Sequence, residues 1–260
     1  MKMKKFTAAL AAAALMMTAV GCGSANTGDT ADTSAAADNA AAEGKTYNIG
    51  IVQLVQHEAL DAATQGFMDT LTEKLGDNVK FDLQNANGES TNCSTIATGF
   101  VASNVDLILA NATAALQASG AATSNIPILG TSVTDYATAL EIDDWTGVTG
   151  RNISGTSDLA PIDEQEEMLK ELFPEVKQVG IIYCSAEANS KYQATLFGDA
   201  LTADGIAFKE YSAADTNEIS AVVSTAVSEC DVLYHRQHNG IFHRDHQEHR
   251  CSRRYPCDRR

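Results

Sequence analysis

The sequence predicts an α/β protein built from two Rossmann-like, doubly wound parallel-sheet lobes, the second of which is incomplete. From Tyr47 onward, short apolar runs rich in β-forming residues alternate with longer segments of helical period. This alternation is typical of a parallel sheet with helices on both faces. A second series starts near residue 150 and stops after Tyr234, so we expect one lobe at 46–150 and a partial lobe at 151–234.

The first lobe is expected to contain strands at 47–54, 79–84, 106–111, 126–129 and 147–149. Between the first two strands, Leu60, Phe67, Leu71 and Leu75 recur at helical spacing and predict the buried stripe of a helix. A second helix is expected to end with the segment 96–105. Each strand is therefore followed by a connection long enough to return the chain for a parallel neighbour.

The second lobe is expected to open with a helix near Pro161, because proline suits the first turn of a helix, and Ser157 or Asp158 is placed to cap it. Strands follow at 178–183, 206–211 and 232–234. A helix that carries Tyr192 and Leu196 lies between the first two of these strands, and another at 217–228 lies between the last two.

The amino-terminal residues 1–22 have the composition of an export signal. Lys2, Lys4 and Lys5 precede an apolar run at 6–20 that is too short for a stable transmembrane helix. The residues just before Cys22 are small and resemble the bacterial lipobox, in which the cysteine is lipidated; an ordinary secretory signal is the alternative. Segment 23–45 is almost wholly small and polar, which predicts a disordered tether. We therefore expect a lipid-anchored protein on the extracytoplasmic side of the cell membrane.

The charge of the chain excludes one class of partner. Its 18 Lys and Arg against 34 Asp and Glu give a formal net charge of −16. Residues 46–233 carry 7 basic and 27 acidic side chains, so the predicted lobes repel phosphate backbones. Nucleic acid is not expected as a partner.

Polar residues follow the predicted strands, where ligands bind in open α/β sheets. Amides and hydroxyls are frequent in the segments 53–58, 111–113, 131–135 and 185–190. A helix that begins in such a segment offers free N–H groups to a carboxylate, so these segments suit a small zwitterion. The alternative is that the residues only cap helices, which we expect for His57.

The sequence gives no support for an enzyme. It contains no G-x-S-x-G elbow, no phosphate-binding G-x-x-x-x-G-K-[ST] loop and no H-E-x-x-H helix. Cys184 has no basic residue nearby in the sequence to activate it, and the acidic run at 163–167 suits the first turn of a helix. We expect neither catalysis nor a cofactor.

Five short motifs are specific enough to compare with known families: Asn48-Ile49-Gly50-Ile51-Val52-Gln53, His57-Glu58-Ala59-Leu60-Asp61, Ile128-Leu129-Gly130-Thr131-Ser132-Val133-Thr134-Asp135-Tyr136, Gly147-Val148-Thr149-Gly150 and Gly180-Ile181-Ile182-Tyr183. Together with the lipobox and the tether, they resemble the bacterial ABC-transporter substrate-binding lipoproteins of the tryptophan/tyrosine-binding group. The resemblance implies a type I periplasmic-binding-protein fold that closes on an amino acid, expected to be aromatic, and delivers it to an ABC permease. It implies ligand contacts from Gln53, Asn111, Thr113, Thr131, Ser132, Asp135, Glu187, Asn189 and Ser190. Among these, Asn189 and Ser190 suit the ligand carboxylate, and Asp135 or Glu187 suits its ammonium group.

The segment 235–260 differs in composition from the rest of the chain. It carries 7 basic and 3 acidic residues, five of the six histidines, and Cys251 and Cys257. One interpretation is a metal-binding tail, which would make the chain a metal-binding surface lipoprotein, although the ligand spacing is weak. A second is a disordered basic tail.

A third interpretation, which we favour, is a shifted reading frame after the Tyr234 codon. Codons that encode His-Arg-Gln-His-Asn, read one base later, encode Ile-Asp-Asn-Thr, and further permitted codons continue into a polar loop, a helix and a strand start. The second lobe would then lack its later strands. On this interpretation we expect the chain as written to bind ligand weakly or not at all.

Overall fold

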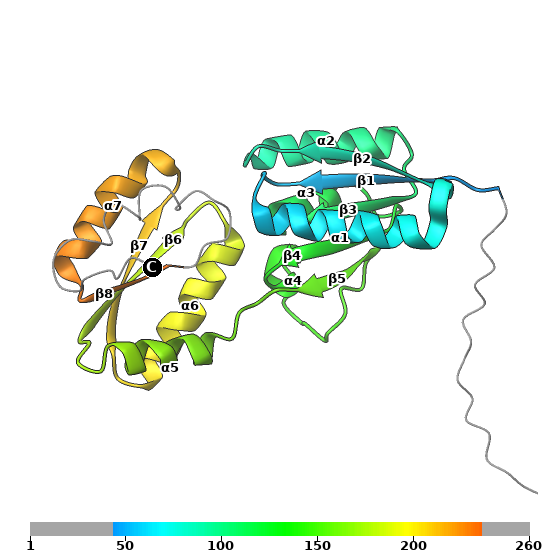
Figure 1. The fold of residues 1–260 in the computed structure, drawn as a ribbon. Helices are drawn as coiled ribbons and strands as arrows, with labels where there is room; N and C mark the ends of the chain where they lie inside the picture. The colour runs from blue at the N-terminus through cyan, green and yellow to red at the C-terminus, as the bar shows by residue number, and fades with distance from the viewer. Residues whose placement is uncertain (1–43, 236–260) are drawn as a thin grey trace, which may run out of the picture. The chain divides into compact units, whose positions relative to one another are not determined.

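A computed structural model describes residues 44–235 (Figure 1). The predicted signal peptide, Cys22 and nearly all of the tether lie outside the described residues, as does the tail from residue 236 onward. Within residues 44–235, no helix combines the length and apolar character needed to cross a bilayer.

The first part of the described chain forms a five-stranded parallel sheet in the order β2-β1-β3-β4-β5. Its strands are β1 (Tyr47–Gln53), β2 (Val79–Asn85), β3 (Leu107–Asn111), β4 (Ile128–Val133) and β5 (Ile153–Ser157). Its helices are α1 (Glu58–Leu75), the short 3₁₀ helix η1 (Gly76–Asn78), α2 (Ser90–Ala102), α3 (Thr113–Ala122) and α4 (Tyr136–Leu140). The predicted alternation of strand and helix is confirmed here.

Side chains of the central strands alternate between two apolar layers, as the pleat of a strand requires. Ile49, Ile51 and Leu109 pack against the predicted stripe of α1. Val52 and Ile108 belong to the opposite layer, which is filled from α2, α3 and α4. Because both faces of β1 and β3 are buried, the polar side chains that end these strands lie at the edge of a rigid core.

The second part forms a three-stranded parallel sheet in the order β7-β6-β8. It consists of α5 (Ile162–Leu172), β6 (Gln178–Cys184), α6 (Ala188–Ala203), β7 (Ala207–Ala213), α7 (Thr216–Glu229) and β8 (Val232–His235). Val179 and Ile181 pack against α5 and α6, and Ile182 packs against α7. Within the described residues β8 pairs only with β6, so this sheet is smaller than the first.

The structure corrects the expected strand at 147–149. These residues form bends in which Gly147 and Gly150 take positive φ angles of 88° and 64°, and Val148 is 67% exposed. The last strand of the first sheet is β5 instead, which pairs with β4. The first sheet therefore continues past the boundary that we placed at residue 150.

The start of α5 also differs from the prediction. Pro161 occupies the N-cap position rather than the first helical turn, and no side chain caps this helix. Ser157 ends β5, where its hydroxyl donates to the carbonyl of Thr134 at 2.7 Å. The expected capping by Ser157 or Asp158 is therefore wrong, because Ser157 and Asp158 complete the pairing with β4 and its following loop.

Candidate functional site

Three of the predicted ligand residues lie side by side at the carboxyl edge of the first sheet. Gln53 ends β1 and Asn111 ends β3, and the two are register partners. Asn111 is in turn the register partner of Thr131 on β4. Neighbouring parallel strands thus bring together residues that are far apart in the sequence, at the edge where such sheets bind ligands.

Hydrogen bonds tie Gln53 and Asn111 to the first turns of α1. Gln53 Nε2 donates to Asp61 Oδ1 at 2.6 Å and to the carbonyl of Val55 at 3.0 Å, and Gln53 Oε1 accepts from Thr64 Oγ1 at 2.7 Å. Asn111 Nδ2 donates to the Leu60 carbonyl at 2.8 Å and to Thr64 Oγ1 at 2.9 Å. Both polar atoms of the Gln53 amide are therefore bonded to α1, whereas one polar atom of the Asn111 amide is not used by these bonds.

That atom is Asn111 Oδ1, which is buried and has no hydrogen-bond partner among the described residues. Two residues later, the hydroxyl of Thr113 is also buried and without a partner in the described part of the chain. Asn111 and Thr113 are 0% and 5% exposed. Buried polar atoms usually have partners, so two orphans at one junction mark a place that a ligand or an ordered water can complete.

The same junction starts α3 without a side-chain cap. Its N-cap residue is Ala112, whose φ of 97° is unusual for a residue with a side chain. An uncapped helix start presents N–H groups to an anion, and the helix dipole favours negative charge there. Strained backbone of this kind is often found at ligand sites.

The fourth strand runs to Val133 instead of the expected residue 129, so the residues predicted to follow it have mixed roles. Thr131 and Ser132 are half-buried residues of β4, and Ser132 has a φ of 56°. Asp135 caps α4, because its Oδ1 accepts from the backbone N–H of Thr138 at 2.7 Å. The Asp135 carboxylate therefore has a structural function in addition to any contact with a ligand.

The remaining predicted residues begin α6 in the second sheet. Glu187 occupies the N-cap position, and Asn189 is buried in the first turn. Ser190 Oγ accepts from the backbone N–H of Cys184 at 2.9 Å, which joins the end of β6 to the helix. The three residues thus lie together at the carboxyl end of β6.

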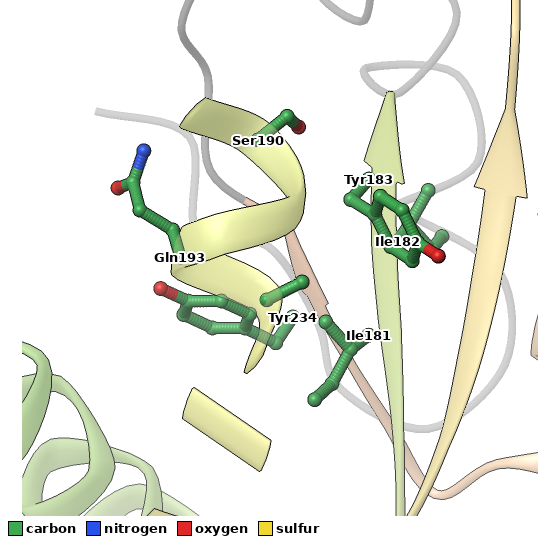
Figure 2. A pocket seen from close by; sticks show the side chains of 7 residues that line it. Ile181, Ile182, Tyr183, Ser190, Gln193 and Tyr234 are labelled. Atoms are coloured by element: carbon green, nitrogen blue, oxygen red, sulfur yellow. The ribbon is translucent and has the colours of Figure 1, made fainter. Parts of the chain in front are cut away.

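A small cavity lies next to this helix start (Figure 2). It is lined by Ile181, Ile182, Tyr183, Ser190, Gln193, Ala194 and Tyr234, and its volume is about 10 Å³. That volume holds roughly one water molecule, whereas ligand pockets measure about 300 Å³ or more. Tyr234, whose ring stacks on Phe197 at 3.6 Å between centroids, lines the cavity from β8. The cavity is too small for an amino acid.

Two residues that were not predicted from the sequence, Thr64 and Asp61, hold Gln53 and Asn111 in place. Thr64 is 3% exposed and lies four residues after Leu60 on the buried face of α1. A polar residue within an apolar stripe was the available signal, because such a residue needs a partner from the sheet below it. His57 caps α1 through Nδ1, which accepts from Ala59 N–H, as expected.

The described residues offer little for catalysis or metal binding. Burial raises the pKa of the Cys184 thiol, and the negative charge of Glu187 raises it further, so the reactive thiolate is disfavoured. Between residues 44 and 235, no three His, Cys, Asp or Glu side chains are grouped to hold a metal ion. The His- and Cys-rich tail lies outside the described residues, apart from His235.

Comparisons with known proteins agree with this architecture. The tyrosine-binding protein of Clostridioides difficile (strain R20291) is 39% identical over 193 residues, which are 73% of this chain and 56% of that protein. The structure of a conserved domain protein from Vibrio cholerae is 34% identical with a TM-score of 0.68, and the match covers 73% of this chain and 65% of that one. The structure of an ABC domain from Streptococcus pneumonia in complex with L-Trp is 33% identical with a TM-score of 0.68, and the match covers 73% of this chain and 64% of that one. A leucine-binding protein from Thermotoga maritima, 18% identical with a TM-score of 0.58, matches 73% of this chain and 55% of its own and shares the fold.

These likenesses confirm the expected α/β fold of a type I periplasmic binding protein. They also show that the chain spans little more than half the length of the tyrosine-binding protein and slightly less than two thirds of the two bacterial structures. The family model for ABC transporter substrate binding proteins matches residues 48–243, about three quarters of the chain. The chain therefore belongs to the ABC transporter substrate-binding protein family.

Proposed function

We propose that the protein is the extracytoplasmic solute-binding component of an ABC importer and that it captures an aromatic amino acid. The observation that carries the proposal is the β3–α3 junction, where Asn111 Oδ1 and Thr113 Oγ1 are buried and unpartnered among the described residues beside an uncapped helix start. A junction of this kind suits a small polar ligand.

The carboxylate of the ligand is assigned to helix starts. Thr113 at the start of α3, and Asn189 and Ser190 at the start of α6, combine hydroxyl or amide groups with backbone N–H groups. Thr131 and Ser132 are assigned to the rim of the same sheet edge, and Asp135 or Glu187 to the ammonium group. Gln53 contributes indirectly, because its amide is already bonded to α1 and to Val55.

The aromatic preference rests on the relatives. One is named a tyrosine-binding protein, and another was solved in complex with L-Trp. We extend this class of ligand to the present protein because both relatives are more than 30% identical to it over 73% of the chain. We assign no catalytic role to the protein. The partners that we propose for it are an ABC permease and, through a lipid anchor on Cys22, the outer face of the membrane.

The shifted reading frame after Tyr234 is part of the proposal. In the described residues, the edge of β8 that faces away from β6 carries no further strand, and the relatives are longer than the matched region. Full affinity is therefore expected from a protein that continues in the alternative frame, and weak affinity or none from the 260-residue chain.

Calorimetric titration with L-tyrosine and L-tryptophan tests the proposal, with L-leucine as the control ligand. Two proteins are compared: the 260-residue chain, and the completed protein, which continues in the alternative frame after Tyr234. We expect the completed protein to bind at least one aromatic amino acid at micromolar concentration. Replacement of Thr113 by Val should weaken that binding about tenfold, the usual effect of one lost hydrogen bond, while Thr98→Val on the exposed face of α2 should leave it unchanged. Absence of binding by the completed protein would contradict the proposed function, and micromolar binding by the 260-residue chain would contradict the frame shift.

A further inference from the structure

The side-chain amide of Asn111 can adopt only one of its two orientations. Its Nδ2 group donates to the Leu60 carbonyl at 2.8 Å and to Thr64 Oγ1 at 2.9 Å. A carbonyl oxygen only accepts hydrogen bonds, so the atom that faces Leu60 must be the nitrogen. Rotation of the amide by 180° would lose both bonds and place Oδ1 against an acceptor.

The hydroxyl of Thr64 supports the same orientation. Its proton is directed to Gln53 Oε1 at 2.7 Å, so its oxygen is left to accept from Asn111. The Gln53 amide is oriented in turn, because its Nε2 donates to the Asp61 carboxylate at 2.6 Å and an ionised carboxylate only accepts. The donor and the acceptor of every bond in this network are therefore fixed: Asn111 donates to Thr64, Thr64 donates to Gln53, and Gln53 donates to Asp61.

The consequence is a fixed acceptor at the β3–α3 junction. Asn111 Oδ1 is buried and has no partner in the described part of the chain, and it cannot be exchanged for a donor. Two residues further on, Thr113 and the start of α3 supply donors. An acceptor and a set of donors this close in the chain match a ligand that carries an ammonium and a carboxylate group on one carbon atom.

We propose that Asn111 Oδ1 accepts a hydrogen bond from the primary ammonium group of the ligand, and that Thr64 is the positioning residue that orients it. The inference rests on the proposed function and names the acceptor that distinguishes an aromatic amino acid from an aromatic acid without the amino group. Aromatic carboxylic acids that lack the amino group satisfy the donors of α3 but leave Oδ1 without a partner.

The test compares L-tryptophan with indole-3-propionate, which lacks only the ammonium group. Both affinities are measured by titration of the completed protein, because weak binding or none is expected from the 260-residue chain. We expect the unmodified protein to prefer L-tryptophan and the Asn111→Leu variant to lose about tenfold to hundredfold of that preference, the effect of a hydrogen bond to a charged group. The ratio of the two affinities is the readout, because partial unfolding lowers the affinity for both ligands by the same factor.

Variants of Thr64 keep the test decisive where Asn111→Leu does not fold. Thr64 is buried on α1, and Thr64→Val removes its hydrogen bonds while keeping its shape. We expect Thr64→Val to reduce the preference for L-tryptophan and Thr64→Ser, which keeps the hydroxyl, to restore it. The matched control is Thr72→Val, because Thr72 lies on the exposed face of α1 and bonds only within the helix among the contacts described.

The outcomes separate this inference from the function on which it rests. If the completed protein binds no aromatic amino acid, the proposed function fails and this inference fails with it. If L-tryptophan binds and the preference survives both Asn111→Leu and Thr64→Val, the ammonium group is held elsewhere and only this inference is overturned. A reduced preference in those variants, together with an unchanged Thr72→Val control, supports it.

Discussion

At the strand ends, Asp135 combines an observed structural role with the binding role that we propose for it. Asp135 caps α4 through its bond to Thr138 N–H, and it also lies in the loop that follows β4, where ligands are expected. A carboxylate and an amide cap a helix about equally well, but only the carboxylate carries the charge that pairs with an ammonium group. Substitution can therefore separate the two roles.

The cap and the charge of Asp135 are tested by two variants. We expect Asp135→Ala to lower the free energy of unfolding by about 1 kcal/mol and Asp135→Asn to change it by only a few tenths. Urea denaturation followed by circular dichroism measures both. Asp199→Asn, at an exposed position of α6, is the control for loss of charge alone. Equal destabilisation by Asp135→Ala and Asp135→Asn would show that charge, and not capping, stabilises this loop.

At the scale of elements, paired glycines determine how closely β4 and β5 approach α4. Gly130 and Gly155 are register partners, and the Tyr136 ring lies over both of them. Tyr136 Oη donates to the carbonyl of Thr156 at 3.3 Å, so the phenol group is held by the neighbouring strand. A side chain at either glycine would displace the ring from this position.

A single methyl group at this pair is expected to disrupt the pairing of β4 with β5. The Cβ of Gly155→Ala would overlap the Tyr136 hydroxyl and the Gly130 carbonyl and would lie 2.7 Å from Gly130 N. Because backbone atoms cannot move aside cheaply, we expect a loss of about 2 kcal/mol or more in the free energy of unfolding.

The matched control for this change is Gly66→Ala. Gly66 lies within α1, and no atom outside its own helix turn is close to its expected Cβ. An alanine there should stabilise the protein by about 0.5–1 kcal/mol, because alanine loses less conformational freedom than glycine in a helix. Thermal denaturation of the two variants should therefore shift in opposite directions, and a neutral Gly155→Ala would contradict the packing described.

At the scale of the whole molecule, the two sheets differ in how completely their strands are paired. In the first sheet β1, β3 and β4 have a neighbour on both edges. In the described part of the second sheet only β6 does, and every residue of β8 is half-buried. Each sheet also has its own apolar clusters, which are formed by different helices.

Native-state hydrogen exchange is expected to show this difference. Amide groups of β6 and β8 should exchange faster than those of β1 and β3, with a difference in opening free energy of about 1 kcal/mol or more, because less apolar surface supports the second sheet. Mass spectrometry of proteolytic fragments makes the comparison within one sample. Equal protection of β6 and β1 would show that the two sheets open as a single cooperative unit.

The sequence predicted the ends of the first and third strands to within one residue, because apolar runs mark where these strands stop, whereas the fourth strand extends four residues past its expected end at residue 129. Gln53 and Asn111 were located in this way, and the structure makes them register partners. The sequence prediction failed at β5, because Ile153–Ser157 is mostly polar, whereas the nearby Val148 and Thr149 are β-branched and favour a strand. Local composition cannot show that the glycines at 147 and 150 form bends.

The sequence by itself determined the family, the parallel α/β architecture and the polar character of the sheet edge, because these depend on the periodicity and order of residues along the chain. The tertiary structure alone decided which polar atoms are already bonded. It joined Gln53 to Asp61 and Thr64, and left Asn111 Oδ1 without a partner among the described residues. The reason is physical: a hydrogen bond between residues 47 positions apart depends on how a helix packs on a sheet, and no local pattern specifies it.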